Sequence, residues 1–198
     1  TSQPSIEAFA SVYKEILAQG KEIITIVISE RLSGTHNSAS AAAAMTSPDK
    51  ISVIDSETTV SNLKILVQIA RDMAEQGSSR QEIVEAIEQQ KKRMQVILVA
   101  NTLEYLRRGG RLSAAQAVIG TLLNVKPILE LKDGKLEAVA KVRGKGKALD
   151  YLAAHVPENV TAITVLHILV PEDAKLIQHK LQERFPHIQV GIDEIGPM

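Results

Sequence analysis

The chain has 198 residues, of which 44% are hydrophobic and 23% charged, so it can bury one large core or two small ones and is not disordered by composition. Its 23 basic side chains balance 23 acidic ones, which argues against a protein that attracts nucleic acid through its overall charge. The absence of cysteine excludes disulfides and thiol catalysis and fits a cytoplasmic location, and no apolar run approaches the roughly 18 residues of a membrane-spanning helix.

The first half of the chain alternates helices and strands. Apolar residues at helical spacing from Ile6 to Leu17 predict a helix, with Gly20 as its C-terminal cap. The β-branched run from Ile23 to Ile28 predicts a strand buried on both faces, and therefore a parallel one. The other elements expected here are a short helix over 38–44, a strand over 51–54, a helix from 60 to 73 ended by Gly77, and a helix that opens with a capping box of Ser79 and Glu82 and ends in the basic run 91–93, where cations suit the helix dipole.

The second half begins with a strand at Val96 to Val99 and then changes its pattern. Apolar segments on either side of Asp133-Gly134 predict an antiparallel hairpin, because this pair readily adopts the positive φ angles of a tight turn. The other elements expected are a helix opened by a capping box of Ser113 and Gln116, helices over 148–154 and 174–184, and strands over 163–168 and 190–192.

These elements predict an α/β fold of two lobes with a ligand cleft between them. Residues 1–92 form a partial α/β lobe with a parallel sheet, and residues 93–198 form an α+β lobe with a mixed or antiparallel sheet. Both ends of the sequence are loop-like, so we expect the chain to be a fragment of a longer protein, truncated at both ends.

The loop from Ser29 to Thr35 is the strongest candidate for a binding site. It joins the carboxyl end of a buried strand to the start of a helix, where ligands collect in open α/β sheets and backbone amides favour an anion. Ser29, Ser33 and Thr35 supply neutral hydroxyl donors, and Gly34 allows close approach of the backbone. The loop therefore predicts a cradle for a carboxylate or phosphate, although ordinary helix capping by Ser33 or Thr35 explains the same residues as well.

There are two further polar segments: Thr1 to Ser5 precedes a helix, and Asp55-Ser56 follows a strand. Each alone fits a cap or a turn, but three hydroxyl-bearing segments at one sheet edge would form a site. His36 lies within the first hydroxyl loop.

The remaining motifs give no complete catalytic site. The basic segment from Val142 to Lys147 is broken by glycines but is not a Walker loop, since no Ser or Thr follows its lysines, and the five histidines lack the spacing of a metal site or a triad. We therefore expect a protein that is not an enzyme and that has no cofactor and no metal.

The motifs together resemble the DegV family of bacterial fatty-acid-binding proteins, which includes the acyl carriers that serve fatty acid kinase. The resemblance spans the whole chain, and its motifs occur in family order: Thr1-Ser2-Gln3-Pro4-Ser5, Ile28-Ser29 with Leu32-Ser33-Gly34-Thr35 and Ser38-Ala39, Ile54-Asp55-Ser56, Leu103 to Leu106 with Gly109-Gly110-Arg111, Leu123 to Leu129, Arg143 with Lys147-Ala148, and Gly196-Pro197.

The resemblance implies a carrier of one long-chain fatty acid such as palmitate or stearate, with the acyl chain buried between the lobes. The carboxylate would then bind the hydroxyls of Thr1, Ser29 and Ser33, with Ser2 and Thr35 nearby. The residue matching Arg143 lies near the site mouth in members that work with the kinase, where it helps to present the carboxylate. These expectations make fatty acid kinase a partner and are compatible with a peripheral membrane contact.

The sequence departs from the family pattern at several positions. The family's strand bearing Thr-Asp-Ser and its histidine-containing glycine-rich loop both lie outside these residues. Glu30 stands where the family often has a serine, and its charge would repel the carboxylate of the ligand unless its side chain points outward. The main alternative is a phosphotransferase related to dihydroxyacetone kinase, which uses the serine loop and Arg143 around a phosphate. A regulator that binds nucleic acid through Arg107, Arg108, Arg111 and the lysines near Arg143 is a third hypothesis, but the neutral net charge argues against it.

Overall fold

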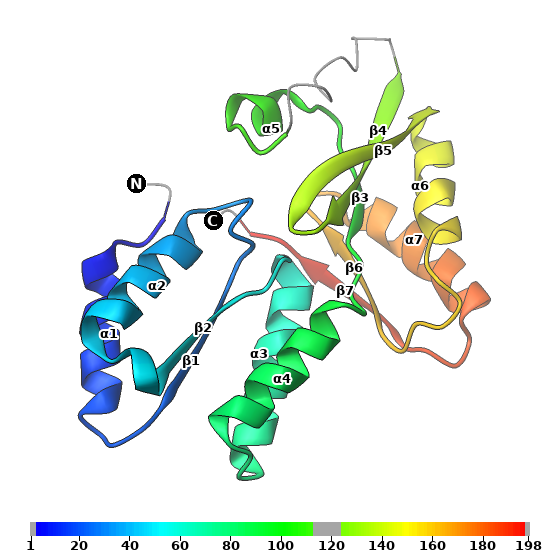
Figure 1. Ribbon diagram of the computed structural model, residues 1–198. Coiled ribbons are helices and arrows are strands. Elements are labelled where there is room, and N and C mark those ends of the chain that lie inside the picture. Colours follow the sequence, from blue (N-terminus) through cyan, green and yellow to red (C-terminus); the bar gives the residue numbers. More distant parts are fainter. Residues whose placement is uncertain (1–2, 113–123, 197–198) are drawn as a thin grey trace. The chain divides into compact units, whose positions relative to one another are not determined.

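The computed structural model describes residues 3–112 and 124–196 of the chain, and it divides into two compact units (Figure 1). The first unit consists of residues 1–96 together with the short segment 131–136, and the second consists of residues 97–130 and 137–198. The capping box expected at Ser113 and Gln116 lies outside the described residues.

The first unit is built around two parallel strands. Strand β1 pairs with β2 so that Ile23 lies opposite Ile51 and Val27 opposite Asp55, as the buried β-branched runs predicted. The capping box of Ser79 and Glu82 is present at the start of α4, as predicted. The elements of this unit are α1 (Ile6–Leu17), β1 (Ile23–Val27), α2 (Thr35–Thr46), a 3-10 turn (Pro48–Lys50), β2 (Ile51–Asp55), α3 (Val60–Glu75) and α4 (Arg80–Lys91).

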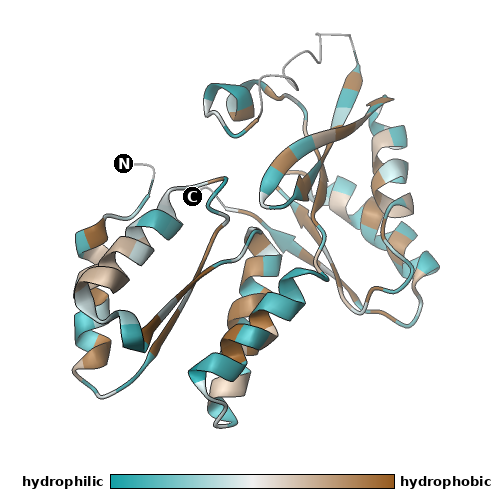
Figure 2. Ribbon diagram, in the orientation of Figure 1, coloured by the Kyte–Doolittle hydropathy of each residue, from teal (hydrophilic) through white to brown (hydrophobic). Residues whose placement is uncertain are grey.

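Helices cover both faces of this sheet and give the unit three layers (Figure 1). On one face α1 and α2 pack in a cluster that includes Tyr13, Ile23 and Ala42, and on the other α3 and α4 pack around Ile54 and Leu66. Figure 2 shows both strands as hydrophobic along most of their length, as strands between two helical layers must be. The small side chains of α2 let this helix lie close to the sheet.

The second unit contains a three-stranded sheet and a separate two-stranded one. Within the described residues, β3 pairs antiparallel with β4, which neighbours β5, and β6 pairs parallel with β7. Ile177 contacts the core clusters beside both sheets and so links them. The elements are β3 (Ile97–Val99), α5 (Glu104–Arg108), β4 (Val125–Lys132), β5 (Lys135–Arg143), α6 (Lys145–Ala154), β6 (Ile163–His167), α7 (Pro171–Arg184) and β7 (Val190–Glu194).

The hairpin of β4 and β5 turns at Asp133 and Gly134, as the sequence predicted. Their φ angles are +46° and +75°, and two consecutive positive values are what a type I′ hairpin turn requires. The predicted fold class, α/β with a parallel-sheet unit and a unit that contains an antiparallel sheet, is confirmed.

The core of the first unit provides a direct test of these helix assignments. Leu66 on α3 is completely buried, whereas its neighbour Val67 is 48% exposed. We expect Leu66→Ala to lower the free energy of unfolding by about 2–5 kcal/mol, because it leaves a cavity, and Val67→Ala to change it by about 0.5 kcal/mol or less. Urea denaturation measures both, and equal losses would contradict the orientation of α3.

Candidate functional site

The loop that follows β1 folds around Ser29, whose exposed fraction is 0%. Its backbone N–H donates to the carbonyl of Thr58 at 3.0 Å, and its carbonyl accepts from the N–H of Ser33 at 3.0 Å. Its hydroxyl donates to the carbonyl of Gly134 at 2.7 Å and accepts from the N–H of Arg31 at 3.2 Å. Ser29 therefore ties this loop to two other segments, and its one hydroxyl proton already has an acceptor.

Helix α2 begins at Thr35 with an open N-terminus. Gly34 is the N-cap residue, no side chain makes the capping hydrogen bond, and the first turn has no acidic residue. The hydroxyls of Ser33 and Thr35 lie 2.8 Å apart, and Ser33 accepts one long hydrogen bond of 3.4 Å from the Thr35 N–H. Helix capping by these hydroxyls is therefore limited to the bond from the Thr35 N–H. One of the two hydroxyl protons is used in the bond between Ser33 and Thr35, and the other can be donated to a ligand.

Gln3 packs directly over Gly34. Its side-chain amide donates to the carbonyl of Gly34 and to the hydroxyl of Ser38, both at 3.0 Å. A Cβ atom on Gly34 would lie 2.1 Å from Oε1 of Gln3, so this position has no room for a side chain. The close approach predicted for Gly34 is thus used by Gln3, a contact that the sequence did not reveal.

The polar segment after β2 forms a tight turn that binds the backbone. Oδ1 of Asp55 accepts from the N–H of Glu57 at 2.9 Å and from the N–H of Glu30 at 3.1 Å. The buried hydroxyl of Ser56 donates to the carbonyl of Thr58 and accepts from its N–H, both at 3.2 Å. The turn interpretation of this segment is correct, and the turn also holds the loop after β1.

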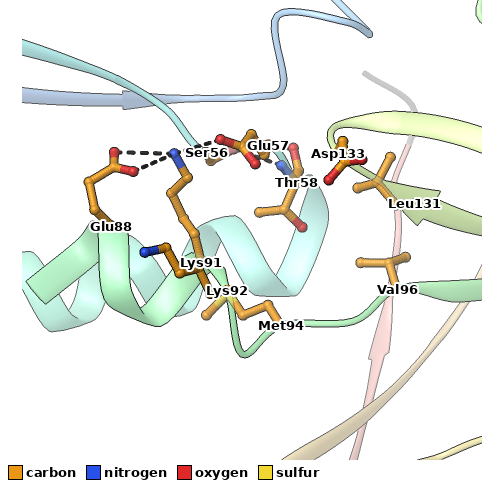
Figure 3. A pocket seen from close by; sticks show the side chains of 10 residues that line it. All are labelled: Ser56, Glu57, Thr58, Glu88, Lys91, Lys92, Met94, Val96, Leu131 and Asp133. Atoms are coloured by element: carbon orange, nitrogen blue, oxygen red, sulfur yellow. Dashed lines mark hydrogen bonds and ion pairs between the residues drawn. The ribbon is translucent and has the colours of Figure 1, made fainter.

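A pocket of about 380 Å³ lies beside this turn in the first unit (Figure 3). Within it, the side chain of Lys91 is only 7% exposed, and Nζ lies 3.0 Å from the carboxylate of Glu57 and 2.9 Å from that of Glu88. Figure 3 shows the ammonium between the two acids. The residues that line the pocket are Ser56, Glu57, Thr58, Glu88, Lys91, Lys92, Met94, Val96, Leu131 and Asp133.

Burial of Lys91 lowers its pKa, but the hydrogen bonds and charges of Glu88 and Glu57 outweigh that effect, so the pKa lies above its ordinary value. Lys91 therefore stays charged in the folded protein. The sequence placed this lysine in a basic helix end, and it does lie in the last turn of α4. Composition and spacing gave no sign of its burial, because Glu57 comes from a different segment.

Glu30, the departure from the family pattern, points toward positive partners rather than into an apolar space. Its side chain is 40% exposed, and its carboxylate lies 3.9 Å from Nε of Arg31 and 3.4 Å from Nδ1 of His36. Arg31 and, when protonated, His36 offset its charge locally.

The structure brings together part of the predicted site. Gln3, which follows Thr1 and Ser2, contacts the loop after β1, but Thr1 and Ser2 themselves lie outside the described residues. Arg143 ends β5 in the second unit, where it is exposed. The predicted residues that the loop itself contains are Ser29, Ser33, Gly34 and Thr35.

Two other kinds of function find no support in the part of the chain that the structure describes. No group of three or more His, Asp or Glu side chains in residues 3–112 and 124–196 could hold a metal ion. No helix in these ranges combines the length and the apolar character that are needed to cross a bilayer.

Comparison with known proteins gives a single family. The DegV family model matches residues 1–198. A DegV domain-containing protein of Halalkalibacterium halodurans is 32% identical over 204 residues, which cover 100% of this chain and 72% of that protein.

Solved structures agree with this match. A DegV family protein from Thermus thermophilus, described as fatty acid binding, superimposes with a TM-score of 0.82 at 31% identity, over 98% of this chain and 71% of that one. The B3 protein of fatty acid kinase from Streptococcus pneumoniae, loaded with linoleic acid, superimposes with a TM-score of 0.84 at 26% identity, over 98% of this chain and 70% of that one.

The contact between Ser29 and Gly134 can be tested with two glycines. Both Gly134 and Gly77 have positive φ angles, +75° and +85°, but a Cβ on Gly134 would lie 2.4 Å from Oγ of Ser29, whereas a Cβ on Gly77 would meet nothing within 4 Å. We expect Gly77→Ala to cost about 1–2 kcal/mol of unfolding free energy from its φ angle alone, and Gly134→Ala to cost clearly more. Equal losses in urea denaturation would show that the hairpin tip does not press on Ser29.

Proposed function

This chain belongs to the DegV family, and from that membership we propose that it binds a long-chain fatty acid such as palmitate or stearate. The carboxylate binds at the loop between β1 and α2, and the acyl chain is buried among aliphatic side chains. The relatives from Thermus thermophilus and Streptococcus pneumoniae, one fatty acid binding and the other loaded with linoleic acid, support this proposal.

The hydroxyl pair of Ser33 and Thr35 at the N-terminus of α2 is the observation on which the site assignment rests. Helices α1, α4 and α7 each have an acidic residue in the first turn, which complements the positive end of the helix dipole. Helices α2, α3 and α6 have neither an acid nor a side-chain cap there, and α2 in addition carries the hydrogen-bonded hydroxyl pair of Ser33 and Thr35. An external carboxylate supplies the missing negative charge and accepts the free hydroxyl proton.

The carboxylate head and the acyl tail contribute different amounts of binding free energy. About fifteen buried groups of an acyl chain contribute roughly 0.8 kcal/mol each, or about 12 kcal/mol before the entropy cost of binding is subtracted. Each hydrogen bond to a charged head contributes only about 1.5–3 kcal/mol. The tail therefore supplies most of the affinity, and the hydroxyl loop fixes the position of the carboxylate.

The residues of the site have different roles in this proposal. Ser33 and Thr35 offer a free hydroxyl proton, and Gly34 lets Gln3 pack against the loop between them. Ser29 lies at the base of the loop and can donate to a carboxylate only when it releases the carbonyl of Gly134. Thr1 and Ser2 complete the hydroxyl set.

We propose that the protein is a carrier in the cytoplasm and not an enzyme. It presents the carboxylate to fatty acid kinase, and Arg143 acts in that presentation rather than in binding the acyl chain. The kinase then transfers the terminal phosphoryl group of ATP to the carboxylate, which gives an acyl phosphate and ADP.

Binding is tested by mass spectrometry of organic extracts from the purified protein, followed by titration with fatty acid. We expect stoichiometric fatty acid from the unaltered chain, and an affinity about tenfold to a hundredfold lower for Ser33→Ala, because the charged head loses a hydroxyl donor. Ser78→Ala, in the connection between α3 and α4, is the matched control and should bind normally. A loaded wild type with indistinguishable variants would place the head group elsewhere, and a wild type that never takes up fatty acid would refute the proposed function.

The kinase role is tested by acyl phosphate formation from loaded protein, ATP and a fatty acid kinase. We expect Arg143→Ala to slow this reaction while fatty acid affinity stays unchanged, since the exposed guanidinium acts at the carrier–kinase encounter. Lys141→Ala, another exposed cation on β5, is the control. Equal rates for the wild type and both variants would remove Arg143 from the mechanism.

A further inference from the structure

The ion cluster at Lys91 joins two segments that the β-sheet does not connect. Lys91 lies in the last turn of α4, and Glu88 is one turn earlier on the same helix, so their ion pair is local. Glu57 lies in the turn after β2, so its ion pair with Lys91 fixes that turn to the helix. With its side chain only 7% exposed, Lys91 loses much of its hydration, and the two ion pairs offset that cost.

The turn that Glu57 occupies needs such support. Glu57 has a φ of +52° and Val60 a φ of +45°, and side chains with a Cβ rarely adopt this left-handed conformation, β-branched valine least of all. Strained backbone of this kind persists only where the surroundings over-determine it, and it gathers at functional sites. The Lys91 ion pair and the bonds to Asp55 are the contacts that hold Glu57 in place.

The same turn carries the loop that we propose as the fatty acid site. The carbonyl of Thr58 accepts from the N–H of Ser29, and the carboxylate of Asp55 accepts from the N–H of both Glu57 and Glu30. A displacement of Glu57 would therefore be transmitted to the backbone at the first two residues of the binding loop.

We propose that Lys91 is a positioning residue for the fatty acid site: it holds Glu57 and, through the turn from Asp55 to Thr58, sets the position of the hydroxyl loop. This inference rests on the proposed function. In this role Lys91 acts through the turn and not by contact with the carboxylate.

Two carboxylates on the same ammonium give a matched test. Glu57 and Glu88 lie 3.0 Å and 2.9 Å from Nζ of Lys91, and their side chains are 50% and 46% exposed. Each of Glu57→Gln and Glu88→Gln removes one negative charge that pairs with Lys91. Only Glu57 lies in the turn, so only the first substitution acts on the turn. We expect Glu57→Gln to weaken fatty acid binding about 2- to 30-fold, the range for coupling through a packed network, and Glu88→Gln to leave it unchanged. Equal affinities of the two variants would overturn the inference.

Replacement of the lysine itself separates charge from packing. Lys91→Met should weaken fatty acid binding as Glu57→Gln does. Lys91→Arg keeps the charge and should therefore retain most of the affinity. Lys92→Met, at the neighbouring exposed lysine, should have no effect. Full affinity of a folded Lys91→Met protein, or no rescue by Lys91→Arg, would count against the inference. If Lys91→Met does not fold, the two glutamate variants decide.

The outcomes also separate this inference from the proposed function. A wild type that binds no fatty acid refutes both. A wild type that binds, with a Glu57→Gln variant that binds equally well, refutes only the role of Lys91. The melting temperature of each variant shows whether a loss of affinity exceeds what a loss of stability explains.

Discussion

A completely buried serine must have every polar group satisfied within the protein, and this requirement organises the first unit. Ser29 satisfies its polar groups with hydrogen bonds to three segments. It donates to the carbonyl of Thr58 in the turn after β2 and to the carbonyl of Gly134 at the hairpin tip, and it accepts from N–H groups of its own loop. Three stretches of chain are thereby brought to the carboxyl end of β1. The N-terminus of α2 follows directly, so these bonds help to set its place.

The candidate site depends on neutral donors in a neighbourhood of paired charges. Glu30 lies near Arg31 and His36, and Lys91 is held by two carboxylates, whereas the hydroxyls of Ser33 and Thr35 bond to each other. Neutral donors suit a carrier, because they hold a carboxylate without binding it so strongly that it cannot be released. In such a design the acyl chain supplies most of the affinity.

Local patterns predicted the elements of the fold and part of the site. Periodicity gave the buried strands and their helices, and Asp133-Gly134 gave the hairpin turn, because each of these depends on neighbouring residues. The hydroxyl loop was predicted as a binding site from its place after a strand, and that role stays a prediction. The contacts of Gln3 with Gly34 and of Lys91 with Glu57 were missed, because they join segments far apart in the sequence and leave no periodic signal. The two separate sheets of the second unit were likewise beyond local patterns, since strand pairing is a non-local choice.

The hydrogen bond from Ser29 to Gly134 spans 105 residues, although both belong to the same compact unit. During synthesis the strands and helices of this unit can form long before the hairpin tip exists, and until then the hydroxyl of Ser29 has no carbonyl to receive its proton. Closure of such a large loop carries an entropy cost and slows folding. The first unit should therefore reach its final packing late, after β4 and β5 have left the ribosome, and the hydroxyl loop matures with it.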